Sequence, residues 1–289
     1  MATFNVLVGI GIAVVAALPV FWIRSKPKRL IALVIALVLG MGGAKLSNQY
    51  LYPEYLSWRF EEELKKQPLF DMIAKNHPKE FARFIQKVKQ TLRENEDTAL
   101  VSSYSAEFVN SIFYQHLQHA PDDNIVLYLK ATIDLYQHLN GKDPRAVVKL
   151  ESANNTIAFD LNTLWEDKDF RALLSHLLDT KRYVIEAGIK SPHQPEDGAK
   201  ADALLQGVLN ELVAKYGDSV VTNVFSSTDT TVPPNVGAQV IIQFYSNILG
   251  TGKENAGMIM RHIARIKAQK EQSQVDKVKE EETKKDAKP

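Results

Sequence analysis

Near its beginning the chain contains a run of twenty residues, 4–23, without a single charged side chain. At a rise of ~1.5 Å per residue, a helix of this length crosses the ~30 Å hydrocarbon core of a bilayer. The overall composition hides this feature, because 45% hydrophobic residues, 24% charged residues and a net charge of +1 are typical of a soluble globular protein. We expect residues 4–23 to form a first transmembrane helix.

A second apolar run, residues 30–44, has fifteen residues and covers only ~22 Å as a helix. Lys45 can extend its amine towards the headgroups, and Leu46 prolongs the apolar face. Aromatic residues then follow at the depth of a membrane interface: Tyr50, Tyr52, Tyr55 and Trp58. We expect residues 30–46 to span the membrane a second time. The alternatives are a re-entrant or interfacial helix, or a single anchor followed by a buried amphiphilic segment.

Four basic residues lie between the two runs, in the loop 24–29: Arg24, Lys26, Lys28 and Arg29. The positive-inside rule places this loop in the cytoplasm, so both ends of the hairpin would cross to the other side. A cleaved signal peptide fits poorly, because no basic residue precedes the first run. We expect a bacterial inner-membrane protein whose C-terminal domain is periplasmic. If the second run does not span, the same domain is cytoplasmic.

Small residues recur every four positions in both runs, which places each set on one helical face. They are Gly9, Ala13 and Ala17 in the first run, and Ala32, Ala36, Gly40 and Ala44 in the second. Small side chains let the backbones of membrane helices approach closely. These faces are candidate packing surfaces within the hairpin or against another membrane protein. The simpler explanation is that glycine and alanine are common in membrane helices.

Charge is segregated along the chain. Residues 1–46 contain no Asp or Glu and carry +5, residues 47–264 carry −6, and residues 265–289 carry +2. An acidic central region disfavours nucleic acid as a partner. The absence of cysteine excludes disulfides, thiolate catalysis and Cys-ligated metal sites.

The remaining sequence predicts an all-α domain over residues 47–266, either a helical bundle or an α-solenoid-like array. Seven prolines each precede a stretch with apolar residues at three- and four-residue spacing: Pro53, Pro68, Pro78, Pro121, Pro144, Pro195 and Pro234. Only residues 220–225 and 239–245 are β-branched enough to allow a strand. The loop 188–198 (GIKSPHQPEDG) is a candidate subdomain break. Residues 267–289 form a charged tail, which we expect to be disordered or a solvated helix.

The sequence contains no strong motif for phosphate binding, metal binding or catalysis. Residues 250–253 (GTGK) lack the spacing of a phosphate-binding loop and suit a helix end and turn. One group of side chains has spacing that would suit a divalent metal: His116, His119, Asp122, Asp123, Asp134 and His138. Because histidines near helix ends commonly cap carbonyl groups instead, we predict no metal, cofactor or catalytic residue.

The functional expectation is therefore architectural. The sequence favours a non-enzymatic, membrane-anchored scaffold, adaptor or assembly subunit of a cell-envelope or secretion complex, acting through contacts with other envelope proteins or with itself. The alternative is an enzyme or small-ligand receptor with a site between helices.

Overall fold

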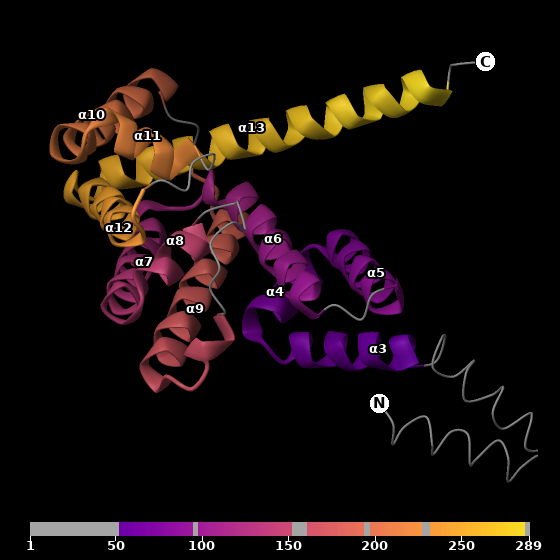
Figure 1. Cartoon of the computed structure of the whole chain (residues 1–289). Coiled ribbons are helices and arrows are strands. Elements are labelled where there is room, and N and C mark those ends of the chain that lie inside the picture. Colours follow the sequence, from indigo (N-terminus) through magenta and orange to yellow (C-terminus); the bar gives the residue numbers. More distant parts are fainter. Residues whose placement is uncertain (1–51, 95–97, 152–160, 194–196, 227–231, 287–289) are drawn as a thin grey trace, which may run out of the picture. The chain divides into compact units, whose positions relative to one another are not determined.

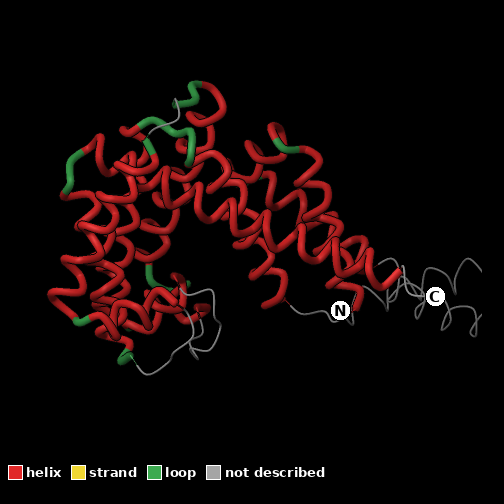
Figure 2. Tube along the Cα trace, turned by 90° about the horizontal axis from the view of Figure 1, so that it is seen from above, coloured by secondary structure: helices red, strands yellow, loops and turns green. Residues whose placement is uncertain are grey.

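The computed structural model describes residues 52–94, 98–151, 161–193, 197–226 and 232–286. Within these ranges the chain forms helices joined by short loops, with no strand (Figures 1 and 2). The predicted all-α class is confirmed for this part of the chain. The two β-branched stretches lie in helices α11 (Asp218–Ser226) and α12 (Pro234–Gly250).

Prolines stand at helix starts, as predicted. Proline is the first residue of α4 (Pro68–Asn76), α5 (Pro78–Glu94), α8 (Pro144–Glu151) and α12. The first residue of a helix has no intrahelical partner for its amide hydrogen, so the missing N–H of proline costs nothing there. Pro121 instead occupies the N-cap of α7 (Asp122–Lys142).

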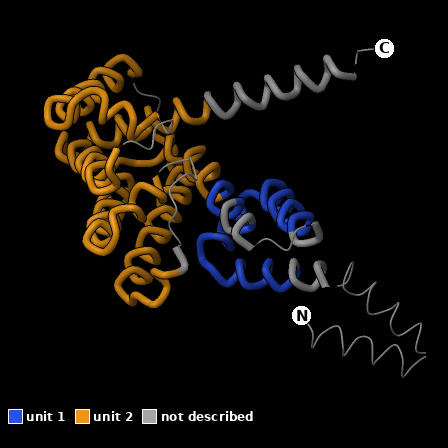
Figure 3. The backbone as a smooth tube through the Cα atoms, viewed as in Figure 1, with its two compact units in different colours: residues 1–108 blue, residues 109–289 orange. Residues whose placement is uncertain are grey.

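The chain divides into two compact units, residues 1–108 and 109–289 (Figure 3). The boundary falls inside α6 (Thr98–Leu117). Residues 188–198, where the sequence suggested a break, lie wholly within the second unit.

The described part of the first unit consists of α3 (Tyr52–Lys65), α4, α5 and the first half of α6. Its core is aromatic. The rings of Phe84 and Phe108 stack in parallel with centroids 4.5 Å apart, and Phe81 packs against both at 6.2 Å. The buried aliphatic residues Ile73 and Val88 complete this core.

In the second unit, α7 is the central helix. It packs against α8, α9 (Lys168–Lys190), α12 and α13 (Lys253–Asp286). Buried residues therefore cover most of its circumference: Ile125, Tyr128, Leu129, Ala131, Thr132, Ile133, Leu135, Tyr136 and Leu139. Its exposed stripe consists of Asp123, Leu127, Lys130, Asp134, Gln137 and Gly141, and the last residue, Lys142, is exposed as well. The remaining helix, α10 (Gly198–Tyr216), packs against α11, α12 and α13.

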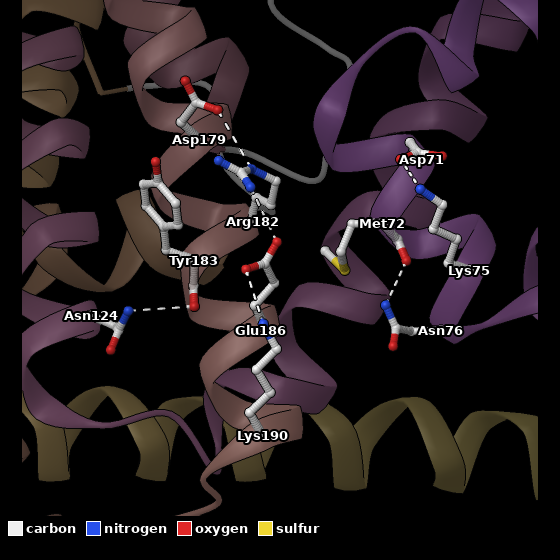
Figure 4. Close-up of polar contacts among 10 residues, drawn as sticks. All are labelled: Asp71, Met72, Lys75, Asn76, Asn124, Asp179, Arg182, Tyr183, Glu186 and Lys190. Atoms are coloured by element: carbon white, nitrogen blue, oxygen red, sulfur yellow. Dashed lines mark hydrogen bonds and ion pairs between the residues drawn. The ribbon is translucent and has the colours of Figure 1, made fainter.

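Helices α7 and α9 run antiparallel. Near the start of α7, the side-chain amide of Asn124 donates to the carbonyl oxygen of Tyr183 at 3.4 Å, and near its end His138 contacts Asp167, the N-cap of α9. Figure 4 shows the contact of Asn124 beside a ladder of ion pairs along α9, in which Arg182 lies between Asp179 and Glu186. The same figure shows an ion pair within α4 of the first unit, where Lys75 contacts Asp71 at 2.6 Å.

The GTGK segment forms the turn between α12 and α13. Gly250 ends α12, and Lys253 begins α13. Between them, Gly252 has φ of +91°, a left-handed conformation that disfavours any other residue. The sequence of residues 250–253 predicts a helix end and a turn, and the structure confirms this prediction.

The predicted membrane hairpin lies wholly outside the described ranges, with both small-residue faces and the basic loop, and so does Tyr50 of the predicted aromatic belt. Tyr52, Tyr55 and Trp58 belong to α3, and Trp58 is 58% exposed. Among the described residues, none of the helices combines the length and the apolar character needed to cross a bilayer.

Candidate functional site

The second unit contains a polar cluster centred on Glu151, the last residue of α8. One carboxylate oxygen of Glu151 accepts a hydrogen bond from the hydroxyl of Tyr136 at 2.8 Å, and the other accepts one from Tyr245 at 2.8 Å. The two rings meet edge to face with centroids 5.9 Å apart. A single carboxylate thus connects α7, α8 and α12.

Burial raises the pKa of both phenols well above the usual value, and the negative charge of Glu151 raises each pKa further. Burial also raises the pKa of Tyr128, about two helical turns before Tyr136 on α7. These phenols therefore stay protonated at neutral pH and act as hydrogen-bond donors.

Lys181 of α9 lies close enough to Glu151 for the carboxylate charge to influence it. Its amine donates a hydrogen bond to the side-chain oxygen of Asn110 at 2.9 Å and lies 5.1 Å from the ring centroid of Phe113. Burial and, to a smaller extent, the positive charge of Lys267 lower the pKa of Lys181 to about 8, although the negative charge of Glu151 opposes this shift. Part of the side-chain surface remains exposed. The amine is consequently more often neutral than that of an ordinary lysine.

Tyr114 and Lys267 lie next to this cluster. The Lys267 amine donates to the hydroxyl of Tyr114 at 2.7 Å and lies 4.2 Å from the centre of its ring. This contact joins α13 to α6, and it adds a positive charge near Lys181.

A second polar group ties α13 to the start of α7. Arg261, 1% exposed, donates to the carbonyl oxygen of Ala120 at 2.8 Å and forms an ion pair with Asp122 at 2.7 Å. Gly257 makes room for the carboxylate, because a Cβ at this position would overlap the side chain of Asp122. These contacts serve the packing of the two helices.

A third polar group connects the end of α7 with the start of α9. The carboxylate of Asp167 accepts from the backbone N–H groups of Asp169 and Phe170, and it contacts His138 at 3.0 Å and Lys142 at 3.3 Å. The hydrogen bonds from the backbone, above all from Phe170, lower the pKa of Asp167, and those from His138 and Lys142 lower it further.

The six candidate metal ligands are placed apart. Helix α6 ends at Leu117, so His116 and His119 do not share a helical face. Asp122 pairs with Arg261, Asp123 with Lys253, and His138 with Asp167, while Asp134 lies on the exposed stripe of α7. In the described part of the chain, no three acidic or histidine side chains are arranged to hold a metal ion.

Sequence reasoning did not identify Glu151 or Lys181. One signal was present in the sequence, because Tyr128 and Tyr136 lie in a largely apolar stretch, and a buried tyrosine hydroxyl needs a hydrogen-bond partner. Other contacts of the cluster join residues that are distant in sequence: Tyr245 lies 94 residues after Glu151, and Lys181 lies 71 residues after Asn110.

Comparison with known proteins does not identify a family, because neither a family model, a curated protein nor a solved structure matches this chain.

Proposed function

We propose that this protein is a membrane-anchored helical scaffold or assembly subunit of the bacterial cell envelope. Two apolar runs without acidic residues support the anchor, and the all-helical fold of the described region supports the scaffold. In this proposal residues 4–23 and 30–46 form a hairpin in the inner membrane, the loop 24–29 is cytoplasmic, and the domain after residue 46 is periplasmic.

The scaffold role is supported mainly by polar side chains of the second unit that connect one helix to another. Arg261 with Asp122, Glu151 with Tyr136 and Tyr245, and Asp167 with His138 all join one helix to another. Polar contacts between helices favour a single rigid arrangement, as a protein that presents surfaces to partners requires.

The membrane topology tests the first half of the proposal. Alkaline phosphatase and a cytoplasm-active fluorescent protein would each be fused after Trp58. Phosphatase activity without fluorescence is the expected result. Fluorescence without phosphatase activity would place the domain in the cytoplasm, as expected if residues 30–46 do not span.

A surface of the second unit offers a test of the second half. Leu127 on α7 is 48% exposed and Tyr183 on α9 is 43% exposed. Asn124, three residues before Leu127, donates to the backbone carbonyl of Tyr183, which supports a common surface for these two side chains. Large apolar side chains exposed together are typical of protein contact surfaces.

A photo-crosslinking residue at Leu127 or Tyr183 should capture a second copy or a specific envelope protein in intact cells. Glu211, an exposed residue of α10, is the control position and should give no product. A detergent-extracted monomer that yields no crosslinked product at either position would argue strongly against a scaffold.

The cluster around Glu151 favours a second candidate, a small-ligand receptor or enzyme with a site between helices. Its carboxylate, phenols and amine come from four helices, as in many sites of helical bundles. A thermal-shift screen against small metabolites tests this role. A ligand that raises Tm in the wild type and fails in Tyr245→Phe would favour it over the scaffold.

A further inference from the structure

We propose that an exposed basic stripe on α5 binds the anionic headgroups of the lipids beside the membrane anchor. The proposal rests on the anchor proposed above and adds to it a lipid contact made by the first unit. Three residues form the basic stripe: Lys79, Arg83 and Lys87. Their spacing of four places them along one side of the helix, and all three are exposed.

The core of the first unit fixes the direction in which the basic stripe faces. Phe81, Phe84 and Val88 lie on another face of α5, and each is at most 5% exposed. The ring of Phe84 stacks on that of Phe108 with centroids 4.5 Å apart, and α5 also packs against α3 and α4. Because rotation of α5 about its axis would expose these apolar side chains to water, the basic stripe stays on the surface.

The neighbouring helices place opposite charges at the spacing that α5 uses for like charges. Lys65 pairs with Glu61 on α3, and Lys75 pairs with Asp71 on α4, each at 2.6 Å and four residues apart. Such pairs stabilise a helix, whereas like charges four residues apart destabilise it. The charges of the basic stripe therefore repel one another, and an anionic partner would relieve this repulsion.

Acidic neighbours neutralise the basic stripe only in part. Lys87 lies 3.7 Å from Glu107, but the two side chains are 51% and 70% exposed, so water screens the pair. Glu80 is exposed in the first turn of α5. Within the described part of the chain, no carboxylate forms an ion pair with Lys79 or Arg83. Both charges are therefore available to an external anion.

The length of the connecting chain keeps α5 near the bilayer. The proposed second span ends at residue 46 and α3 begins at Tyr52, so the connection between them reaches at most about 20 Å. A domain tethered in this way meets the headgroups at a high effective concentration, and weak attractions then suffice to hold it there. Each Lys or Arg beside an anionic membrane surface raises the ratio of docked to undocked domain about fivefold.

The test uses the full-length protein reconstituted into vesicles of phosphatidylcholine, with or without phosphatidylglycerol, that carry a spin label on the headgroups. Because the chain has no cysteine, Gln86→Cys gives a unique fluorophore site, exposed on α5 seven residues after Lys79. Gln206→Cys on α10 is the control position in the second unit. Phosphatidylglycerol should increase quenching at position 86 more than at position 206. About 0.5 M NaCl, which shortens the Debye length to ~4 Å, should reverse the increase.

Two double variants separate the basic stripe from net charge. Lys79→Gln with Arg83→Gln should lower the ratio of docked to undocked domain about 25-fold, the product of two fivefold effects. Lys65→Gln with Lys66→Gln removes the same charge at the end of α3, from residues that pair with carboxylates. The control variant should keep the full response to phosphatidylglycerol.

Two results would overturn the proposal while the anchor stands. Quenching at position 86 that does not respond to phosphatidylglycerol would exclude the lipid and favour an acidic protein surface as the partner. Equal losses in the two double variants would show that net charge, and not the basic stripe, is responsible. Washing the vesicles with sodium carbonate tests the anchor separately. Release of the protein by this wash would contradict the membrane hairpin, and the lipid contact of α5 would fall with it.

Discussion

The guanidinium of Arg261 lies 2.7 Å from the carboxylate of Asp122, so a buried cation on α13 is paired with the first residue of α7. The same guanidinium donates to the carbonyl oxygen of Ala120, 141 residues away in sequence. A few residues earlier on α13, Lys253 pairs with Asp123 at 2.6 Å, but both of those side chains are exposed. The two neighbouring ion pairs therefore differ mainly in burial.

Arg261→Met should lower the free energy of unfolding by about 3 kcal/mol, because it leaves the largely buried carboxylate of Asp122 and the carbonyl of Ala120 without their partner. Lys253→Met should change stability very little, since exposed ion pairs contribute little. Urea denaturation measures both. Adding Asp122→Asn to Arg261→Met should restore part of the loss, and a double variant no more stable than the single one would contradict the role of charge.

Glycine-to-alanine substitutions in α9 and α10 should have opposite signs. A Cβ at Gly188 would lie 2.5 Å from the carbonyl oxygen of His116, so Gly188→Ala must push α9 away from α6 and lower Tm. Gly207 of α10 has nothing within 4 Å of the same position, and Gly207→Ala should stabilise by about 0.5–1 kcal/mol through helix propensity. Equal shifts in the two variants would show that α9 and α6 are not in close contact in solution.

The local features of this fold were predictable from sequence, because helix starts and apolar faces depend on residues a few positions apart. Prolines such as Pro68 and Pro144 indicate starts for a reason that is purely local. In residues 239–245 the local preference for a strand does not decide the structure. Their β-branched residues lie in α12, where Val240 and Ile241 are buried. The free energy gained by burial exceeds the small cost of β-branched residues in a helix.

The candidate site was not predictable, because its members come together only when the helices pack. Tyr245 and Glu151 are 94 residues apart, and no periodicity of either helix indicates that they will meet. The six residues with spacing suited to a metal do not come together either, for a related reason. The spacing of His116 and His119 suggested one helical face, but α6 ends at Leu117 between them.

Asp167 should make stability depend on pH in the acid range. Hydrogen bonds from the backbone and from His138 and Lys142 lower its pKa in the folded state, so the unfolded chain takes up the proton first as pH falls. Its stabilising effect is therefore present above about pH 4 and is lost below it. Asp167→Asn should be less stable than wild type at pH 6, and the difference should shrink towards pH 2.5.

Asp197 provides the control for that series. It caps α10 through the N–H groups of Ala199 and Lys200, but no ion pair joins it to a described histidine or lysine. Asp197→Asn removes a helix cap without removing a contact to histidine or lysine, and it is the reference for the loss of a cap alone. Identical pH profiles for the two asparagine variants would mean that the contacts with His138 and Lys142 contribute nothing.

The buried phenols should have the opposite pH dependence, at the alkaline end. Burial and the charge of Glu151 raise the pKa of Tyr245 in the folded state, so the unfolded chain loses this proton first as pH rises above about 10. Stability should fall from there, by up to about 1.4 kcal/mol per pH unit for each such phenol. Tyr245→Phe should lose about 1 kcal/mol at pH 8, where its hydrogen bond to Glu151 is intact, and should show a shallower alkaline slope than wild type. Tyr183→Phe removes a hydroxyl at an exposed position and is the control for the loss of a hydroxyl alone. A Tyr245→Phe slope as steep as the wild-type slope would rule out this phenol as a source of the alkaline instability.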